Sequence, residues 1–331
     1  MLRRSCLGFL LGTLILAPGQ ASAGPALVFE PYNGTVFYSE DPDQPWFPAS
    51  LTKLMTAYVT FQAIKQGKIS LDTNISCSKN AVAQAPSKLG LPVGGQITVD
   101  VALKVLIVRS ANDVAVMLAE AVGGDLDSFV AEMNATAQRL GMTKTHFANV
   151  NGLPDERQVT TARDLAKLAR AIIVEFPEYA SIFALPQVQV GKQLIRTHNG
   201  LLIDYPGADG MKTGFICNSG YNVVASATRD GRKLVAVVLG EVSIASRRDR
   251  ATDLLENGFK RYFWKSVFGT SLDGLAMQAS VTDQPTHLFD SICGPGRAAA
   301  RAAVAGKPRA SSGTKRAKLK IKPSSAVAAT P

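Results

Sequence analysis

The spacing of apolar residues changes twice along this chain, and the order of the changes constrains the fold. The segment ALVFEPYNGTVFYSE, residues 26–40, holds two runs of β-forming residues around Asn33-Gly34, a strong hairpin signal. Helical periodicity then occupies 51–66, 99–109, 113–122, 126–140 and 161–174. Strand-like runs return at 187–195, 221–228 and 233–240, before an amphipathic helix over 247–263.

Strands at both ends of the chain enclose a helical middle, which is not the alternating pattern that gives a parallel sheet. We therefore expect an α+β fold, with one antiparallel sheet built from both ends of the chain and flanked by helices. A mostly helical second lobe would be inserted at about residues 70–175. The chain has 331 residues, of which 46% are hydrophobic, and can bury one sizeable core.

The first residues have the pattern of a secretory signal peptide. Arg3 and Arg4 precede the apolar run CLGFLLGTLILAP, and the small residues ASA end at Ala23. We expect residues 1–23 to be removed by cleavage near Ala23, and the protein to be exported to the periplasm or cell envelope. The alternative is an uncleaved membrane anchor.

Most of the positive charge lies at the two ends of the sequence. The formal net charge is +10, but residues 1–23 hold two arginines and residues 294–331 hold nine lysines and arginines, with no acid in either segment. The middle of the chain is therefore close to neutral, and nothing in it suggests a nucleic-acid partner. We expect residues 266–331 to be a mostly disordered basic tail rich in Ala, Lys and Pro. Such a tail is a solvated spacer or makes weak contact with anionic lipid or cell-wall polymer.

Four cysteines occur, and Cys6 lies in the expected signal peptide. The remaining three leave at least one thiol unpaired or paired between chains. We favour a Cys77–Cys217 disulfide, because Cys293 lies in the expected tail, and three free thiols are the alternative. No Cys-x-x-Cys occurs and the three histidines are far apart, so we expect neither a metal site nor a cofactor.

Ser50 and Lys53, in the stretch PASLTKLMT, are one helical turn apart at the expected start of a helix. A neutral lysine can take the proton of a serine hydroxyl, and burial or nearby positive charge makes an amine neutral. Free N–H groups at a helix N-terminus can stabilise an oxyanion. The pair alone is also explained by a helix N-cap followed by a surface lysine, and Ser312-x-x-Lys315 repeats the spacing in the tail.

Two further motifs follow along the chain. Ser110 and Asn112, in RSAND, fall in a break between two helices, where they are suited to proton relay and to holding a substrate carbonyl. Lys212, Thr213 and Gly214 lie where strand character begins. Lys and Thr can bind a carboxylate, and Gly lets a backbone approach closely. The plainer interpretations are helix capping by Ser110 and an exposed edge-strand lysine.

Ser-x-x-Lys, Ser-x-Asn and Lys-Thr-Gly at 50, 110 and 212 form an ordered set used by penicillin-binding proteins and class A β-lactamases. The segments SLTKLMTAYVTF, LGMTKTHFANVNGLP, TARDLAKLAR, GADGMKTGF and GYNVVASATRDGRKLVAVVLG extend the resemblance over roughly residues 25–265. The chain resembles the low-molecular-mass penicillin-binding proteins that are D-alanyl-D-alanine carboxypeptidases. This implies a DD-peptidase/β-lactamase-like catalytic domain over residues 24–265.

The resemblance implies a role for each matching catalytic position. Ser50 would be the acylated nucleophile and Lys53 its base. Ser110 would relay the proton to the leaving amine. The backbone N–H groups of Ser50 and Phe215 would form the oxyanion hole.

It also implies how the substrate is held. Asn112 would bind the substrate peptide, while Lys212 and Thr213 would line the subsite for its terminal carboxylate. Arg247 falls where the family has an arginine that recognises the same carboxylate, with Arg248 as the neighbouring alternative.

The implied function is removal of the terminal D-Ala from peptidoglycan pentapeptides through an acyl-enzyme, with β-lactams as inhibitors that acylate the same serine. The alternatives are an endopeptidase on peptidoglycan crosslinks, a β-lactamase that uses Glu156, and a non-catalytic wall-binding module. Many family members carry a β-rich second domain and an amphipathic membrane anchor, and we find neither pattern after residue 265.

Overall fold

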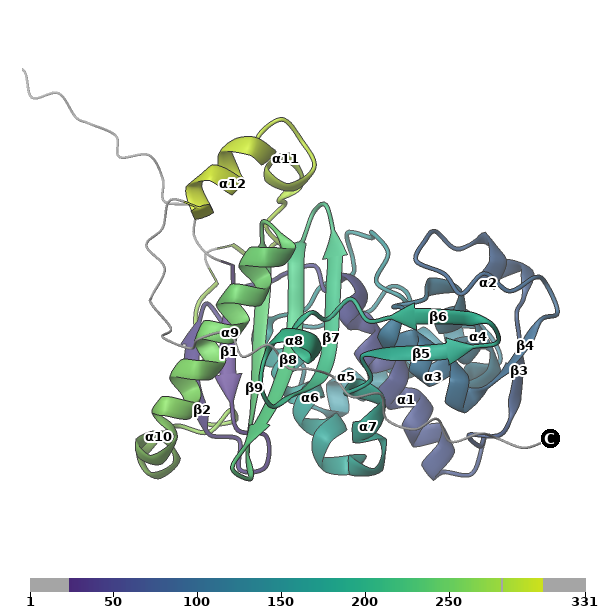
Figure 1. Cartoon of the computed structure of the whole chain (residues 1–331), viewed down its shortest axis with the longest axis horizontal. Coiled ribbons are helices and arrows are strands. Elements are labelled where there is room, and N and C mark those ends of the chain that lie inside the picture. Colours follow the sequence, from purple (N-terminus) through teal and green to yellow (C-terminus); the bar gives the residue numbers. More distant parts are fainter. Residues whose placement is uncertain (1–23, 281, 306–331) are drawn as a thin grey trace, which may run out of the picture.

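The computed structural model describes residues 24–280 and 282–305, and its centre is a five-stranded antiparallel sheet (Figure 1). The strand order is β2-β1-β9-β8-β7. These strands are β1 (Ala26–Phe29), β2 (Val36–Glu40), β7 (Ala208–Ile216), β8 (Gly220–Arg229) and β9 (Arg232–Glu241). The first two and the last three strands come from opposite ends of the described chain, which confirms the predicted α+β architecture.

The helices lie on both faces of the sheet and in the lobe beside it (Figure 1). Their bounds are η1 (Ala49–Thr52), α1 (Lys53–Lys65), α2 (Lys79–Ala83), α3 (Val99–Val108), α4 (Asn112–Gly123), α5 (Leu126–Arg139), α6 (Ala162–Glu175), η2 (Pro177–Tyr179), α7 (Ala180–Phe183), α8 (Leu201–Asp204), α9 (Ile244–Lys260), α10 (Tyr262–Phe268), α11 (Phe289–Ile292) and α12 (Arg297–Ala305). Two small two-stranded sheets complete the lobe: β3 (Asn74–Ser76) with β4 (Gln96–Thr98), and the hairpin of β5 (Gln187–Val190) with β6 (Gln193–Arg196). Within the described residues, none of the helices is long and apolar enough to cross a membrane.

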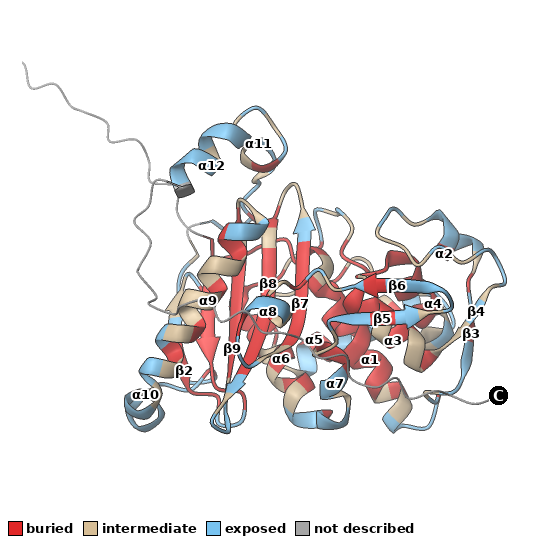
Figure 2. Cartoon of the chain, in the orientation of Figure 1, coloured by how far each residue is buried: buried red, intermediate tan, exposed pale blue. Residues whose placement is uncertain are grey.

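The central strands are buried on both faces, as Figure 2 shows in red. Successive side chains of a strand point to opposite faces. In β9, Val235 and Val237 therefore join the large core shared with α1, α3, α4 and α6, while Ala236 and Val238 join a second core against α9. Because β8 and β9 are covered on both faces, their sequences are nearly continuous apolar runs. The strand order leaves β7 as the sheet edge that faces the helical lobe.

One predicted strand lies outside the main sheet. The run 187–195 forms the separate hairpin β5–β6, turning at Gly191, and the fifth strand of the sheet is β7 instead. Val188 and Ile195 are buried in the core of the helical lobe. The period-2 pattern thus identified a strand correctly but did not specify which core it faces.

The prediction that disorder begins at residue 266 is wrong for residues 266–280 and 282–305. Leu272 is buried against the core, and the guanidinium of Arg163 donates to the carbonyl oxygens of Leu272, Leu275 and Ala276 while it pairs with Asp43. Apolar residues continue beyond 265, so this segment can offset its ordering entropy. The expected signal peptide, and residues 306–331 of the expected tail, lie outside the described residues.

The predicted Cys77–Cys217 disulfide is also wrong. Cys217 is bonded to Cys293, and Cys77 is a free, buried thiol in the core of the helical lobe. The prediction failed because it rested on a mobile Cys293, whereas the ordered segment brings this residue to the turn after β7.

Candidate active site

Ser50 and Lys53 meet at the junction of η1 and α1. Lys53 Nζ lies 2.9 Å from Ser50 Oγ, 2.7 Å from Asn112 Oδ1 and 2.5 Å from the carbonyl oxygen of Asn151. The lysine is completely buried, and the contacts with Asn112 and Asn151 hold its amine beside the hydroxyl.

The surroundings of Lys53 favour the neutral amine. Burial lowers its pKa well below the ordinary value, the positive charge of Lys212 lowers it further, and Asp113 opposes the shift. A neutral amine can accept the proton of Ser50 Oγ. Helix capping does not explain Ser50, because the N-cap positions of η1 and α1 are Pro48 and Thr52.

A loop that carried no predicted role packs against the nucleophile. Gly152 has φ of +82°, and a Cβ on it would lie 1.8 Å from the carbonyl oxygen of Ala49. Ala49 itself has φ of 49°. Only a glycine permits this contact, which brings the carbonyl of Asn151 onto Lys53. The sequence signal for this loop was the segment NVNGLP. It belongs to the resemblance to the family, but none of its residues was given a role.

Ser110 lies in the break between α3 and α4, as predicted, and Asn112 is the first residue of α4, with its side-chain amide on Lys53. Ser110 has φ of 60° and is buried, and its Oγ has no hydrogen-bond partner within the described part of the chain. A buried hydroxyl without a partner is costly, and such sites are often functional. Asn112 accepts from Lys53 and donates through Nδ2 to the carbonyl of Ala85, so its amide orients the lysine.

The edge strand β7 passes directly over the nucleophile. A Cβ on Gly214 would lie 3.2 Å from the backbone nitrogen of Ser50 and 3.0 Å from the carbonyl oxygen of Pro48. Lys212 is buried two residues earlier, and its Nζ donates to the carbonyl of Thr213 over 2.9 Å. Burial and the charge of Arg247 lower the pKa of Lys212 to about 7.

The same strand offers a backbone donor beside Ser50. The N–H of Ile216 points into the β7–β8 turn, where it donates to Ser219 Oγ over 3.3 Å. Because N–H directions alternate along a strand, the N–H of Phe215 points away from β8 to the open edge of the sheet, and β7 is in contact with η1. The N–H groups of Phe215 and Ser50 can therefore serve one oxyanion.

Cationic side chains gather beyond Lys212. Arg247, on α9, is buried and donates to the carbonyl of His198 over 3.4 Å, and burial lowers its pKa to about 10. Desolvation and the charges of Lys212, Arg109 and Arg247 lower the pKa of His198 to about 4. Arg248 pairs instead with Asp204 and Asp249, both at the surface, which favours Arg247 as the anion-binding residue.

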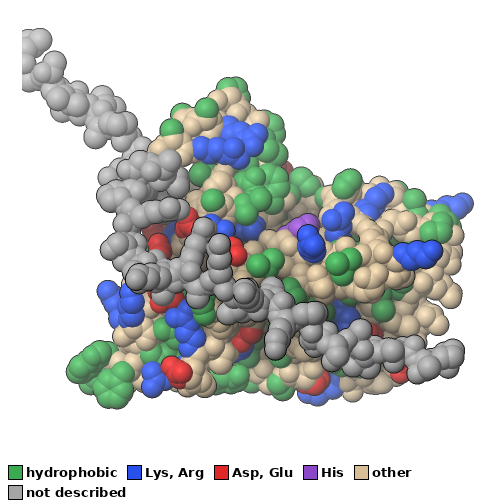
Figure 3. Space-filling view, in the orientation of Figure 1, with side chains coloured by type: hydrophobic (Ala, Val, Ile, Leu, Met, Phe, Trp, Pro, Cys, Tyr) green, Lys and Arg blue, Asp and Glu red, His purple; other side chains and the backbone are tan. Residues whose placement is uncertain are grey.

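A surface pocket of about 570 Å³ adjoins this cationic cluster and is lined by Arg109 and residues 193–198. Figure 3 shows Lys, Arg and His side chains close together in the middle of this face. Among the described residues, no group of three or more His, Cys, Asp or Glu side chains could hold a metal ion. The site therefore combines a serine with a buried amine, two backbone donors and a cationic end suited to a carboxylate.

Comparison with known proteins identifies similar chains. A family model described as D-alanyl-D-alanine carboxypeptidase matches residues 13–243. The chain is 35% identical over 252 residues to the carboxypeptidase DacA of Haemophilus influenzae, covering 75% of this chain and 64% of that protein. It is 38% identical over 242 residues to DacC of Escherichia coli, covering 71% of this chain and 60% of that protein. It thus spans a little under two thirds of the length of these relatives.

Solved structures give the same picture. Penicillin binding protein 5 of Haemophilus influenzae has a TM-score of 0.70 and 36% identity, covering 74% of this chain and 73% of that chain. The DD-transpeptidase of Streptomyces K15 has a TM-score of 0.68 and 29% identity, covering 72% of this chain and 97% of that one.

Proposed function

Because the chain belongs to the D-alanyl-D-alanine carboxypeptidase family, we propose that it removes the terminal D-Ala from peptidoglycan pentapeptides through an acyl-enzyme on Ser50. The observation that carries this proposal is the completely buried Lys53, whose amine lies 2.9 Å from Ser50 Oγ and whose pKa is lowered by burial and by the charge of Lys212. β-Lactams acylate the same serine, because their ring amide resembles the scissile D-Ala-D-Ala amide.

Acylation begins with attack of Ser50 Oγ on the carbonyl of the penultimate D-Ala, while Lys53 Nζ takes the hydroxyl proton. The backbone N–H groups of Ser50 and Phe215 stabilise the oxyanion. Ser110 Oγ, which has no partner in the described structure, passes the proton to the leaving amine of D-Ala. Water then hydrolyses the ester and releases the trimmed peptide.

The cationic end of the site holds the terminal carboxylate. Lys212, Thr213 and Arg247 provide two positive charges and a hydroxyl, and a guanidinium can bind a carboxylate through two hydrogen bonds. An incoming carboxylate also favours the charged form of Lys212, which is only partly populated near pH 7 in the free protein. Asn112 supports the peptide indirectly, through its contact with Lys53.

The β-lactamase alternative receives no support from Glu156. Its side chain is 69% exposed, and its carboxylate lies 3.4 Å from His287 Nε2 rather than beside the nucleophile. The carboxypeptidase and endopeptidase alternatives use the same residues, and digestion of a crosslinked muropeptide separates them by their products.

The test is a mass spectrum of the protein after incubation with penicillin, together with an assay for D-Ala released from a D-Ala-D-Ala peptide. We expect one adduct on Ser50, and its loss together with D-Ala release in Ser50→Ala. Ser312→Ala, in the Ser-x-x-Lys of the expected tail, is the matched control and should keep both. Neither adduct nor D-Ala release from the unaltered chain would refute the proposal.

We also propose export, with cleavage near Ala23 and weak contact between the basic tail and anionic lipid or cell-wall polymer. The Cys217–Cys293 disulfide supports export, since disulfides persist mainly in oxidising compartments. A mature N-terminus at Gly24 in the envelope fraction is the expected result, and an intact Met1 in the cytoplasm would contradict it.

A further inference from the structure

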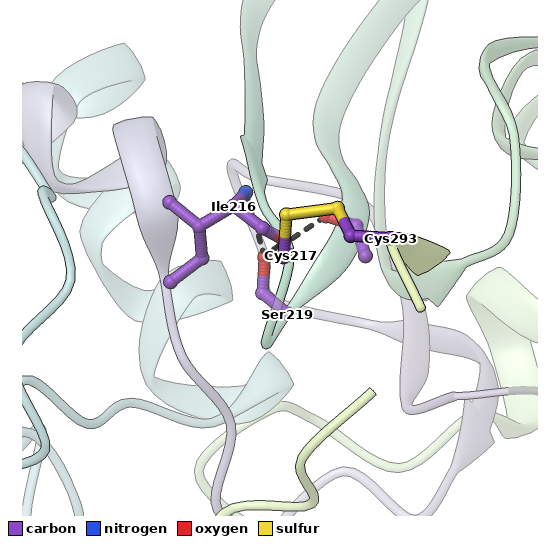
Figure 4. The surroundings of a disulfide bond; sticks show 5 residues. Ile216, Cys217, Ser219 and Cys293 are labelled. Carbon is purple, nitrogen blue, oxygen red and sulfur yellow. Dashed lines mark hydrogen bonds between the residues drawn. A yellow bond between two sulfur atoms is a disulfide. The ribbon is translucent and has the colours of Figure 1, made fainter. Parts of the chain in front are cut away.

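A disulfide ties the C-terminal part of the described chain to the turn that follows β7. Figure 4 shows Cys217 and Cys293 joined beside Ile216 and Ser219. We call residues 282–293 the strap. Its backbone is also bonded to the turn, because the N–H of Leu288 donates to the carbonyl of Asn218 over 2.9 Å.

The strap also contacts the segment that leads to the nucleophile. The ring of His287 packs edge-on against Phe47, with ring centres 5.1 Å apart, and Phe47 lies three residues before Ser50. His287 Nε2 lies 3.4 Å from the carboxylate of Glu156, in the loop that follows Gly152. The strap therefore connects the far end of β7 with the loop that packs against η1.

The direction of β7 indicates which part of a substrate meets the strap, if the proposed function holds. The terminal carboxylate lies at Lys212, and the scissile carbonyl lies beside Gly214 and Phe215. The peptide on the N-terminal side of the scissile bond therefore runs towards Cys217. A strand advances about 3.3 Å per residue, so Cys217 lies about 10 Å beyond Gly214. This is the reach of the third residue on the N-terminal side of the scissile bond.

We propose that the strap is the end wall of a binding subsite for the peptide stem on the N-terminal side of the scissile bond. The Cys217–Cys293 disulfide holds this wall in place, and the exposed ring of Phe215, packed on Tyr221, forms the adjoining floor. A short donor ends before the strap, whereas a complete pentapeptide stem contacts it. The strap thus makes the enzyme selective for long donors without touching the reacting atoms.

The experiment compares two donors in the full chain: an acetylated tripeptide that ends in D-Ala-D-Ala, and the complete pentapeptide stem. The variant is Cys217→Ser with Cys293→Ser, which removes the tether and leaves no new thiol. We expect kcat/KM for the pentapeptide to fall about tenfold through a higher KM, while that for the tripeptide changes less than about twofold. The unaltered protein treated with dithiothreitol should behave like the variant and recover on reoxidation. His287→Ala, which keeps the disulfide, should lower pentapeptide kcat/KM in the same selective way.

Penicillin labelling and melting temperature separate the outcomes. An equal loss of kcat/KM on both donors would make the disulfide a merely structural element and overturn the inference. A variant that loses kcat/KM on neither donor would overturn it as well. In both cases the proposed function stands, because the unaltered protein still trims its donors. If the unaltered protein cleaves neither donor and takes no label, the proposed function and the strap inference fail together.

Discussion

Gly214 lies so close to Ser50 that a Cβ on the glycine would be 3.2 Å from the serine's backbone nitrogen. The same Cβ would be 3.0 Å from the carbonyl oxygen of Pro48, and neither atom belongs to a flexible side chain. The glycine therefore sets the separation between β7 and η1, and with it the geometry of the two N–H groups that would bind an oxyanion.

Gly214→Ala tests this relationship. The added methyl group should push β7 away from η1 and lower the penicillin acylation rate about a hundredfold, the scale of losing one oxyanion donor. Gly200→Ala is the control, because a Cβ added to Gly200 would have Arg248 Cδ, at 4.0 Å, as its nearest neighbour. Stopped-flow acylation checks both variants, and an unaltered rate in a folded Gly214→Ala protein would contradict the role of this contact.

Arg247 and Arg248 are adjacent in sequence but should differ sharply in effect. Arg247→Ala removes a buried cation beside Lys212 and should raise KM for a D-Ala-D-Ala peptide by about a hundredfold, or about 2–3 kcal/mol for a charge-assisted contact. Arg248→Ala removes only surface ion pairs with Asp204 and Asp249 and should change KM less than about threefold. Steady-state kinetics on both variants would show the opposite order if Arg248 binds the carboxylate.

The charge of Lys212 should control the pH dependence of acylation. In the proposed mechanism acylation requires neutral Lys53, so its rate should fall as the pH decreases through the pKa of Lys53. Lys212 lowers that pKa, so Lys212→Met should raise it and move the acid limb of the profile to higher pH. The measurement is the acylation rate at saturating penicillin against pH, with Lys104→Met, which removes a surface cation of α3, as the control. A limb that stays in place or moves to lower pH would contradict the coupling.

The sequence predicted the helices well, because their signals are local, and the structure brings Ser50, Lys53 and Asn112 of the candidate site together. The periodicity that predicted 99–109 and 113–122 matches α3 and α4, and the break between them carries Ser110. Lys212 and Gly214 were identifiable from the Lys-Thr-Gly motif, which lies where strand character begins and matches the third motif of the family. Their convergence on Ser50 follows from the order of the motifs in the family.

Contacts through the backbone and across long separations were not predictable. The backbone carbonyl of Asn151 accepts a hydrogen bond from Lys53, which lies 98 residues away in the sequence. Every residue has such a carbonyl, so the residue type gives no sign of this contact. The partner of Cys217 depended on whether the chain beyond 265 packs, and that packing rests on the guanidinium of Arg163 meeting three carbonyl groups. Composition alone did not predict the packing of this segment.

Ser110→Ala should separate stability from activity. The Ser110 hydroxyl is buried and has no hydrogen-bond partner in the described structure, and leaving such a group unpaired costs about 1–3 kcal/mol. Alanine keeps the same strained backbone at φ of 60°, so the free energy of unfolding should stay constant or rise by about 1 kcal/mol. Loss of the proton relay should lower D-Ala release by about 10²–10⁴-fold.

The control for Ser110→Ala is Ser128→Ala, which removes an exposed hydroxyl that donates to Asp125 at the start of α5. This variant should keep full activity and lose a small part of its stability. Urea unfolding and D-Ala release on both variants provide the comparison. If Ser110→Ala keeps its activity, the Ser110 hydroxyl has no catalytic role. If it is less stable than Ser128→Ala, the hydroxyl has a structural partner.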